Sequence, residues 1–271
     1  MSSKTALVTG ASSGIGKSTV KSLISAGVKV YAAARRTDKM KDLEILGAHI
    51  IKLDVTDEKS MTKCINSILK NEGSVDILIN NAGYGSYGSI EDVPVDEARR
   101  QFEVNIFGLA RLTQMVLPGM RKNRYGKIVN ISSIGGKIYT GFGGWYHATK
   151  HALEGLSDCL RLETEPFGID VIIIEPGGIK TDWGVISADN LKKTSCNGAY
   201  SEAAEKSANA LSKMYTSDKL TNPDVIGKLI LKSVTADKPK TRYSAGYMSW
   251  IALFMRKHVS DRMFDKIIKM M

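Results

Sequence analysis

The chain has 271 residues, of which 43% are apolar and 24% are charged. This is the composition of a globular protein with enough apolar side chains for a sizeable core, and it excludes a disordered chain, a collagen-like fibre and a disulfide-framed miniprotein. The net charge is +10, but Lys and Arg are scattered and mostly accompanied by Asp or Glu. We therefore interpret the charge as a basic surface and expect no nucleic-acid partner.

The cysteines, the N-terminus and the longest uncharged stretch indicate the cellular compartment of the protein. Cys64, Cys159 and Cys196 are odd in number and form no Cys-x-x-Cys pair, so we expect reduced thiols and no metal site. The N-terminus leads directly into a strand-like segment, which argues against a signal peptide. The longest uncharged stretch, residues 243–255, is shorter than the roughly 18 residues of a spanning helix. We predict a cytoplasmic protein.

Short apolar runs alternate with amphipathic stretches along the first 176 residues. The runs are rich in Val and Ile and mostly lack strict alternation, as strands buried on both faces do. The expected strands cover residues 6–8, 28–34, 49–53, 75–79, 127–131 and 170–174. The expected helices cover residues 15–26, 39–46, 58–70, 96–120 and 146–167. This order predicts an α/β fold, a doubly wound parallel sheet of the Rossmann type with helices on both faces.

The alternation stops after Pro176. Residues 182–221 show no strand pattern, and their apolar residues recur at helical spacing, so we predict an insert with a helix that packs on the core. A helix at 223–233, a strand at 241–244 and a tail over residues 245–271 complete the chain. No repeat or linker divides it, so we expect one domain over residues 1–271. For the tail, packing against its own or a partner subunit is favoured over a membrane surface.

A glycine-rich turn joins the first strand to the first helix and reads Thr-Gly-Ala-Ser-Ser-Gly-Ile-Gly over residues 9–16. Its glycines allow the backbone to approach a phosphate, and the helix N-terminus supplies free N–H groups. Gly16-Lys17-Ser18 also matches the end of a P-loop, although that motif needs glycine at Ala11. The glycine turn alone does not distinguish a nucleoside triphosphate from a dinucleotide as its ligand, so residues elsewhere in the chain have to decide.

Tyr146 and Lys150 lie four residues apart in a predicted helix and therefore share one face. A cation there stabilises phenolate and lowers the tyrosine pKa from its reference near 10, so that the tyrosine can exchange a proton near neutral pH. Further polar residues follow the carboxyl ends of expected strands, where ligands bind in open α/β sheets. They are Asp54, Asn80–Gly83, Ser133 and Pro176–Thr181, and Asn105 lies in the helix between two of these strands.

These motifs, in this order over residues 4–181, resemble the short-chain dehydrogenase/reductase family in its single-domain form. The resemblance implies that Tyr146 is the catalytic acid/base and that Lys150 lowers its pKa and holds the nicotinamide ribose. It implies that Ser133 hydrogen-bonds the substrate oxygen and that Asn105 keeps a water that relays protons to Lys150. His147 stands where the family has a small residue, and we interpret it as an accommodated helix residue without a catalytic role.

The resemblance also implies a set of cofactor contacts along the sheet edge, with the pyrophosphate at the glycine turn and adenine near Asp54. The expected contacts are Gly10, Ser12, Ser13, Gly14, Ile15, Gly16, Arg35, Arg36, Asp54, Val55, Asn81, Ala82, Gly83, Tyr146, Lys150, Pro176, Gly177, Ile179 and Thr181. An NAD site places a carboxylate roughly 20 residues past the glycines, whereas Arg35 and Arg36 stand here, and no carboxylate occurs before Asp38. Because Arg pairs with a 2′-phosphate, we predict NADP(H) over NAD(H).

The predicted function is hydride transfer between NADP(H) and a carbonyl or secondary alcohol of a steroid- or lipid-like substrate. Apolar and Met-rich segments near the expected cleft motivate the substrate class. These are Phe142, Trp145, Trp183, Tyr200, Leu211, Met214 and 248–255, and the cations near them are Lys137 and Lys180. The strand end at residues 32–36 and the tail resemble the hydroxysteroid, retinol and acyl-dihydroxyacetone-phosphate reductase branch. The family resemblance implies that the insert over residues 182–221 covers the substrate and that the protein is a homodimer or homotetramer. The alternatives are a 3-oxoacyl carrier-protein reductase and a non-catalytic NADP-binding sensor on the same fold.

Overall fold

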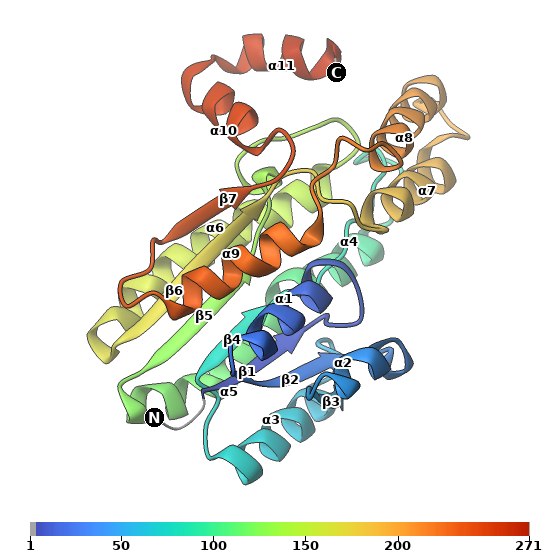
Figure 1. Ribbon diagram of the computed structural model, residues 1–271. Helices are drawn as coiled ribbons and strands as arrows, with labels where there is room; N and C mark the ends of the chain where they lie inside the picture. Colours follow the sequence, from blue (N-terminus) through green and yellow to red (C-terminus); the bar gives the residue numbers. More distant parts are fainter. Residues whose placement is uncertain (1–3, 271) are drawn as a thin grey trace.

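A parallel sheet forms the centre of the molecule (Figure 1). The computed structural model describes residues 4–270, and within them seven strands lie in the order β3-β2-β1-β4-β5-β6-β7. They are β1 (Thr5–Thr9), β2 (Lys29–Ala34), β3 (His49–Lys52), β4 (Ile77–Asn80), β5 (Gly126–Ile131), β6 (Ile169–Pro176) and β7 (Arg242–Ala245). All neighbours pair in parallel. The strand order reverses between β1 and β4, which confirms the doubly wound prediction.

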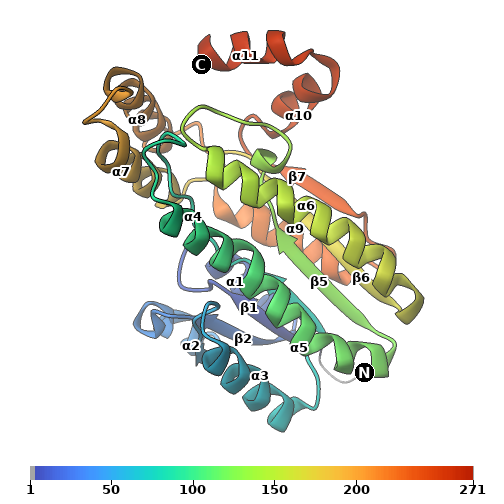
Figure 2. The same ribbon diagram turned by 180° about the vertical axis from the view of Figure 1, so that it is seen from behind.

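Helices cover both faces of the sheet. Their bounds are α1 (Gly14–Ser25), α2 (Lys41–Ile45), α3 (Glu58–Glu72), α4 (Val95–Phe102), α5 (Gly108–Asn123), α6 (Gly144–Thr164), α7 (Trp183–Ser195), α8 (Ser201–Tyr215), α9 (Pro223–Thr235), α10 (Ser249–His258) and α11 (Asp261–Met270). Short 3₁₀ segments are η1 (Thr37–Met40), η3 (Ile134–Gly136) and η4 (Glu165–Phe167), and η2 (Glu103–Phe107) is a π-helical turn. Helices α1 and α9 lie on one face, and α3, α5 and α6 on the other (Figures 1 and 2).

The apolar runs form strands because both sheet faces are covered. In β1, Ala6 and Val8 enter the core beneath α1 and α9, while Leu7 between them enters the core beneath α3 and α5. Side chains of a strand alternate between faces, so a strand in a two-sided core is apolar at every position. The unbroken Val- and Ile-rich runs of the sequence are explained by this burial.

Two predicted elements differ in the structure. The expected helix over residues 96–120 is divided into α4, the π turn η2 and α5, and Asn105 lies in that turn. The insert is a pair of helices, α7 and α8, of which the helical spacing indicated α8. The tail forms α10 and α11, and both pairs project from the same end of the sheet (Figure 1). Among residues 4–270, no helix has the length and apolarity to cross a bilayer.

Candidate active site

A large cavity opens at the carboxyl ends of the strands. Its volume is about 1360 Å³, and its wall comes from the glycine turn, the ends of β2, β3, β4, β5 and β6, the insert and the tail. The reversal of strand order between β1 and β4 lies at this edge, which is where open α/β sheets bind ligands. Nearly all predicted site residues line the cavity, and Gly16 and Asn105 are the exceptions.

The glycine turn has a backbone that other residues adopt only with strain. Gly10 and Gly14 have φ values of +65° and +53°. A methyl group on Gly10 would lie 2.8 Å from Asn81 Nδ2, and one on Gly14 would lie 3.0 Å from Thr181 Cγ2. Ser13, at the start of α1, makes no side-chain capping bond, and the first turn holds no acidic residue. The helix therefore presents N–H groups and a positive dipole end to the cavity, which suits a phosphate.

Gly16 serves packing rather than the cavity wall. A methyl group on it would lie 2.4 Å from Asn81 Nδ2 and 2.5 Å from the Gly10 carbonyl oxygen. The Asn81 amide donates to the carbonyls of Thr9 and Gly10 at 2.9 and 3.2 Å. Gly16 therefore allows α1 to pack closely against the turn, and its contact with a pyrophosphate stays a prediction. Asn81 still lines the cavity, but its amide holds the turn.

The P-loop alternative fails on the positions of its two polar residues. Lys17 pairs with Asp42 at 2.8 Å, and Ser18 donates to Asp224 at 2.6 Å. Neither residue lines the cavity. In a P-loop the lysine would hold phosphates, so Lys17-Ser18 matches that motif by coincidence.

Basic residues stand where β2 ends. Arg35 and Arg36 line the cavity, and Arg36 reaches Ser12 Oγ at 3.4 Å. Beside them, Asp54 accepts hydrogen bonds from the N–H and hydroxyl of Thr56 at 3.0 and 2.8 Å. Burial acts to raise the pKa of Asp54, but these bonds and the charge of Arg35 outweigh it and lower the pKa. The site thus has two guanidinium groups next to one ionised carboxylate.

Ser133, Tyr146 and Lys150 meet on the same wall. Helix α6 carries Tyr146 and Lys150, and Ser133 follows β5. Lys150 Nζ donates to the carbonyl of Ile131 at 2.8 Å and lies 6.0 Å from the centre of the Tyr146 ring. Trp183 of α7 lies over the same ring with a centroid distance of 5.0 Å. The predicted set of catalytic residues is therefore assembled in one place.

The pKa values of this set differ from the sequence prediction. Burial raises the pKa of Tyr146 to about 12, although its hydrogen bond with Ser133 acts in the opposite direction. Burial lowers the pKa of Lys150 to about 8, against the charge of Glu154. The expected lowering of the tyrosine pKa is wrong here because burial dominates and the ammonium bonds a carbonyl instead. At pH 7 Tyr146 is a neutral phenol, able to donate its proton, and Lys150 is mostly charged.

Asn105 lies behind the wall. Its Nδ2 donates to the Tyr84 carbonyl at 3.0 Å and to Thr149 Oγ1 at 3.1 Å, and its Oδ1 accepts from the Tyr84 N–H at 3.1 Å. A methyl group on Gly83 would lie 3.1 Å from that Oδ1. In this structure the side chain thus holds the segment after β4, and the water relay stays a prediction.

His147 explains the glycine-rich loop between Ser133 and Tyr146. The backbone N–H of Thr140 donates to His147 Nε2 at 3.0 Å, so Nδ1 carries the proton and donates to the Gly135 carbonyl at 2.9 Å. Methyl groups on Gly135 and Gly143 would lie 3.1 and 3.0 Å from the imidazole. Burial lowers the pKa of His147, which keeps this ring neutral. The histidine ties both parts of the loop to α6.

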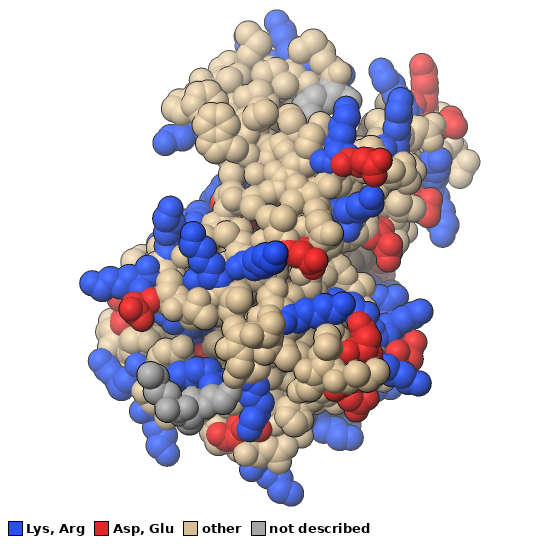
Figure 3. Space-filling model, in the orientation of Figure 1, with Lys and Arg blue, Asp and Glu red and all other residues tan. Residues whose placement is uncertain are grey.

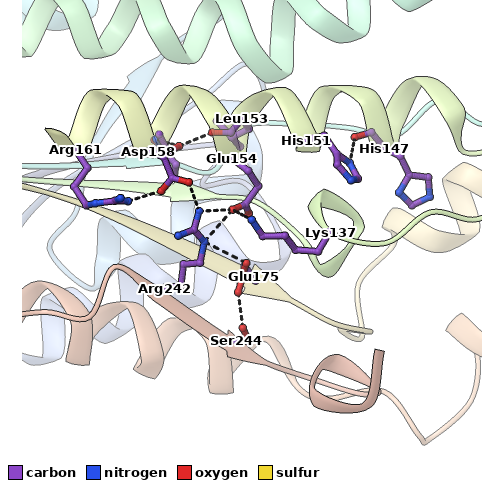
Figure 4. A network of polar contacts seen from close by, with 12 residues as sticks. Lys137, His147, His151, Leu153, Glu154, Asp158, Arg161, Glu175, Arg242 and Ser244 are labelled. Carbon is purple, nitrogen blue, oxygen red and sulfur yellow. Dashed lines mark hydrogen bonds and ion pairs between the residues drawn. The ribbon is translucent and has the colours of Figure 1, made fainter. Parts of the chain in front are cut away.

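A partly buried polar network around Glu154, which sequence reasoning missed, connects α6 with β7 (Figure 4). The charge of Glu154 also acts on Lys150. Glu154 Oε2 accepts from Lys137 at 2.9 Å and from Arg242 of β7 at 3.0 Å. Arg242 also pairs with Asp158 at 2.6 Å and lies 3.6 Å from Glu175. In the sequence, the spacing of four residues between Lys150 and Glu154 was the one feature that could have indicated this network. The network joins α6, the catalytic loop and the last strand.

Comparison with known proteins decides the family. The model of the short chain dehydrogenase family matches residues 4–191. The chain belongs to this family. It is an oxidoreductase of the dehydrogenase/reductase type, acting on CH–OH or C=O groups.

Similar proteins extend over nearly the whole chain. A probable short-chain type dehydrogenase/reductase of Helicobacter pylori is 35% identical and covers 98% of this chain and 96% of its own. The 3-ketodihydrosphingosine reductase of Bacteroides thetaiotaomicron is 36% identical over 89% and 87% of the two chains. The NADPH-dependent 3-dehydrocapnine reductase of Ornithobacterium rhinotracheale is 35% identical over 97% and 95%.

Solved structures agree with the fold. A short-chain dehydrogenase of Streptomyces avermitilis has a TM-score of 0.84 at 33% identity and covers 100% of this chain and 97% of its own. The closed form of serine dehydrogenase complexed with NADP⁺ has a TM-score of 0.77 at 25% identity over 89% and 94% of the two chains. This dehydrogenase architecture thus also occurs with NADP⁺ bound.

Proposed function

We propose that this protein is an NADPH-dependent reductase of ketones attached to long apolar chains. The observation that carries the proposal is one cavity that joins the glycine turn, the two arginines after β2 and the Ser133–Tyr146–Lys150 set to an apolar wall. The names of two relatives, a 3-ketodihydrosphingosine reductase and an NADPH-dependent 3-dehydrocapnine reductase, support it.

The residues present fit a dinucleotide with a 2′-phosphate. Gly10 and Gly14 leave the backbone bare beside the start of α1, where a pyrophosphate would bind. Arg35 and Arg36 would pair with the 2′-phosphate, because a guanidinium forms charge-assisted hydrogen bonds with phosphate oxygens. The segments 81–83 and 176–181 would border the two ends of the nicotinamide riboside. When bound, the cofactor supplies the hydride.

The chain's own residues would control the proton and the carbonyl. Tyr146 is a neutral phenol at pH 7 and would donate its proton to the ketone oxygen as negative charge develops there. Ser133 would donate a hydrogen bond to the same oxygen. Lys150, charged at pH 7 and next to Tyr146 on α6, would favour the phenolate that remains.

The substrate side of the cavity is mostly apolar, although Lys213 and Lys219 also line it. Its wall includes Trp183, Leu191, Leu211, Met214, Met248, Met255, Phe264 and Ile268. Lys137 and Lys180, the cations nearest to the expected cleft in the sequence, pair with Glu154 and Asp218 and do not line the cavity. Met adapts to irregular shapes, and a wall of this kind suits an alkyl chain better than a sugar or a small hydroxy acid.

A turnover assay tests the proposal. The purified protein would be supplied with NADPH or NADH and with ketones of different class: 3-ketodihydrosphingosine, a steroid ketone, a 3-oxoacyl thioester and a small 2-oxo acid. We expect the highest kcat/KM for the long-chain ketone with NADPH, and a kcat about 10²- to 10⁴-fold lower for the Tyr146→Phe variant. A preference for the thioester would favour the alternative function, that of a 3-oxoacyl carrier-protein reductase. Absence of turnover with every ketone would contradict the reductase proposal.

A further inference from the structure

The two tail helices α10 and α11 are apolar on two sides. On the inner side, Ala252 and Phe264 are buried against Ile138 of the loop between Ser133 and Tyr146. Tyr139 donates to Asp265 at 3.0 Å, and the Arg256 guanidinium lies over the Tyr139 ring at 5.5 Å. This side also lines the cavity. The tail therefore packs against its own subunit, and the inner side is accounted for.

The outer side is left exposed by residues 4–270. We define it as Trp250, Ile251 and Phe254 of α10 and Met263 and Met270 of α11. Trp250 is 74% exposed, Phe254 51% and Met263 52%. The rings of Trp250 and Phe254 stack at 5.5 Å, one helical turn apart. Large aromatic side chains grouped in this way on a surface mark an interaction site.

Cations accompany the outer side. Helices α10 and α11 hold five Lys or Arg and two Asp: Arg256, Lys257, Arg262, Lys266 and Lys269, with Asp261 and Asp265. Asp261 pairs with Arg256, and Asp265 accepts from Tyr139, so both carboxylates are engaged. Lys257 follows Phe254 by three residues and Lys266 follows Met263 by three, which places each lysine on the same helical stripe. In Figure 3 the top of the molecule, over these helices, is mostly tan with Lys or Arg at its margin.

We propose that the outer side of α10 and α11 binds an anionic lipid surface. Trp250 and Phe254 would enter the boundary between headgroups and acyl chains, and Lys257, Lys266 and Lys269 would face the headgroups. Helices with aromatic residues on one stripe and lysines beside them bind membranes in this way. A second copy of the chain fits less well, because a symmetric contact would bring the same unpaired lysines together.

The inner and outer sides belong to the same two helices. Binding through the outer side would therefore place the tail wall of the cavity next to the lipid. A long-chain ketone could then pass from the bilayer to Met255 and Phe264 with little exposure to water. This step rests on the proposed function, whereas the lipid binding itself does not.

Sedimentation with vesicles tests lipid binding without substrate or cofactor. The full-length protein would be mixed with phosphatidylcholine vesicles and with vesicles containing about one third phosphatidylglycerol. We expect at least about tenfold stronger partitioning to the anionic vesicles, and its decrease at high salt. The Trp250→Ala/Phe254→Ala variant should lose about tenfold of the binding. Lys257→Glu/Lys266→Glu should remove the preference for anionic lipid.

The matched control is Ile45→Ala/Leu162→Ala, since these side chains are 86% and 66% exposed elsewhere on the molecule. It should sediment like the wild type. The proposal is overturned if the wild type stays in the supernatant with both vesicles, or if the Trp250→Ala/Phe254→Ala variant binds equally well. It is also overturned if that variant instead dissociates an oligomer in solution, which would make the outer side a subunit contact. Turnover of a soluble ketone is measured separately, so failure of lipid binding is distinct from failure of the reductase proposal.

Discussion

On one side of the cavity, which we call the glycine-loop side, the wall is formed by the main chain of the glycine turn. Hydrogen bonds from a side-chain amide hold this main chain in place. Gly10 and Gly14 adopt positive φ, and Asn81 bonds the carbonyls of the turn. On the other side, the insert side formed by α7, α8 and the tail, the wall is apolar side chains in contact, such as Trp183 against Tyr215 at 5.9 Å. The first side is built for a ligand with charges at definite positions, and the second for a ligand with surface but few polar groups.

Tyr146→Phe should have the largest effect, because it removes the phenol that is proposed to donate a proton to the ketone oxygen. We expect kcat to fall about 10²- to 10⁴-fold, with the dissociation constant of NADPH and the melting temperature little changed. Stopped-flow or steady-state kinetics, cofactor titration and thermal unfolding measure these three quantities. A kcat within a few-fold of the wild type would remove Tyr146 from the chemistry.

Substitution of the two arginines should affect the glycine-loop side alone. For Arg35→Ala/Arg36→Ala we expect kcat/KM with NADPH to fall by about 10- to 100-fold, since charge-assisted hydrogen bonds are lost. The value with NADH should change little. The control is Arg99→Ala, an exposed arginine that pairs with Asp96 on α4. Equal losses with NADPH and NADH would show that the arginines do not bind the 2′-phosphate.

Leu211→Ala should affect the insert side alone. Leu211 of α8 lines the cavity, and its truncation removes apolar contact with an alkyl chain. We expect KM for a long-chain ketone to rise about tenfold, with KM for NADPH unchanged. The control is Leu162→Ala, at an exposed position of α6 away from the cavity. A parallel rise in both KM values would mean that the two sides are not independent.

The two sides also differ in how far the sequence could predict them. The glycine turn and the Tyr146–Lys150 pair depend on local spacing, and in the structure both line the same cavity. Helix α7 escaped prediction because the positions it buries include the small residues Gly184, Ser187 and Ala188, which carry no apolar periodicity. For the tail, apolar residues lie on two sides, so spacing could not distinguish a packed face from an exposed one.

Other features depend on contacts between distant parts of the chain. Arg242 and Glu154 form an ion pair although they are 88 positions apart in the sequence, so no local sequence pattern predicts it. The raised pKa of Tyr146 results from burial beneath Trp183, which comes from the insert. The π turn at Asn105 divides a helix that propensity alone would continue, and the Asn105 amide there bonds the segment after β4.

His147→Ala tests whether the loop between the two sides needs its histidine. The variant leaves the Thr140 N–H and the Gly135 carbonyl without their partner, so we expect the free energy of unfolding to fall by about 1–3 kcal/mol. KM for the ketone should rise more than kcat falls, since the loop forms the wall and not the proton donor. His151→Ala is the control, because His151 bonds only the carbonyl of His147. Equal stability and kinetics of both variants would contradict this role.

Glu154→Gln should have the smallest effect, a shift of the alkaline limb of the pH profile. Lys150 has a pKa of about 8, lowered by burial and raised in part by the charge of Glu154. Tyr146 stays protonated far above this pH because its pKa is about 12. Ketone reduction should therefore decline as pH rises through about 8, when Lys150 loses its charge.

Removing the charge of Glu154 lowers the pKa of Lys150 further, so the decline should begin at lower pH, by about one unit or less. The profile of kcat/KM between pH 6 and 10 measures the shift, with Glu163→Gln, an exposed carboxylate of the same helix, as the control. Loss of the Glu154 pairs with Lys137 and Arg242 would lower stability or activity equally at every pH. Only a change in the pKa of Lys150 would shift the alkaline limb of the pH profile. A limb that stays in place while activity drops uniformly would assign Glu154 to packing of β7 against α6, and the charge on Lys150 would then be set by its burial alone.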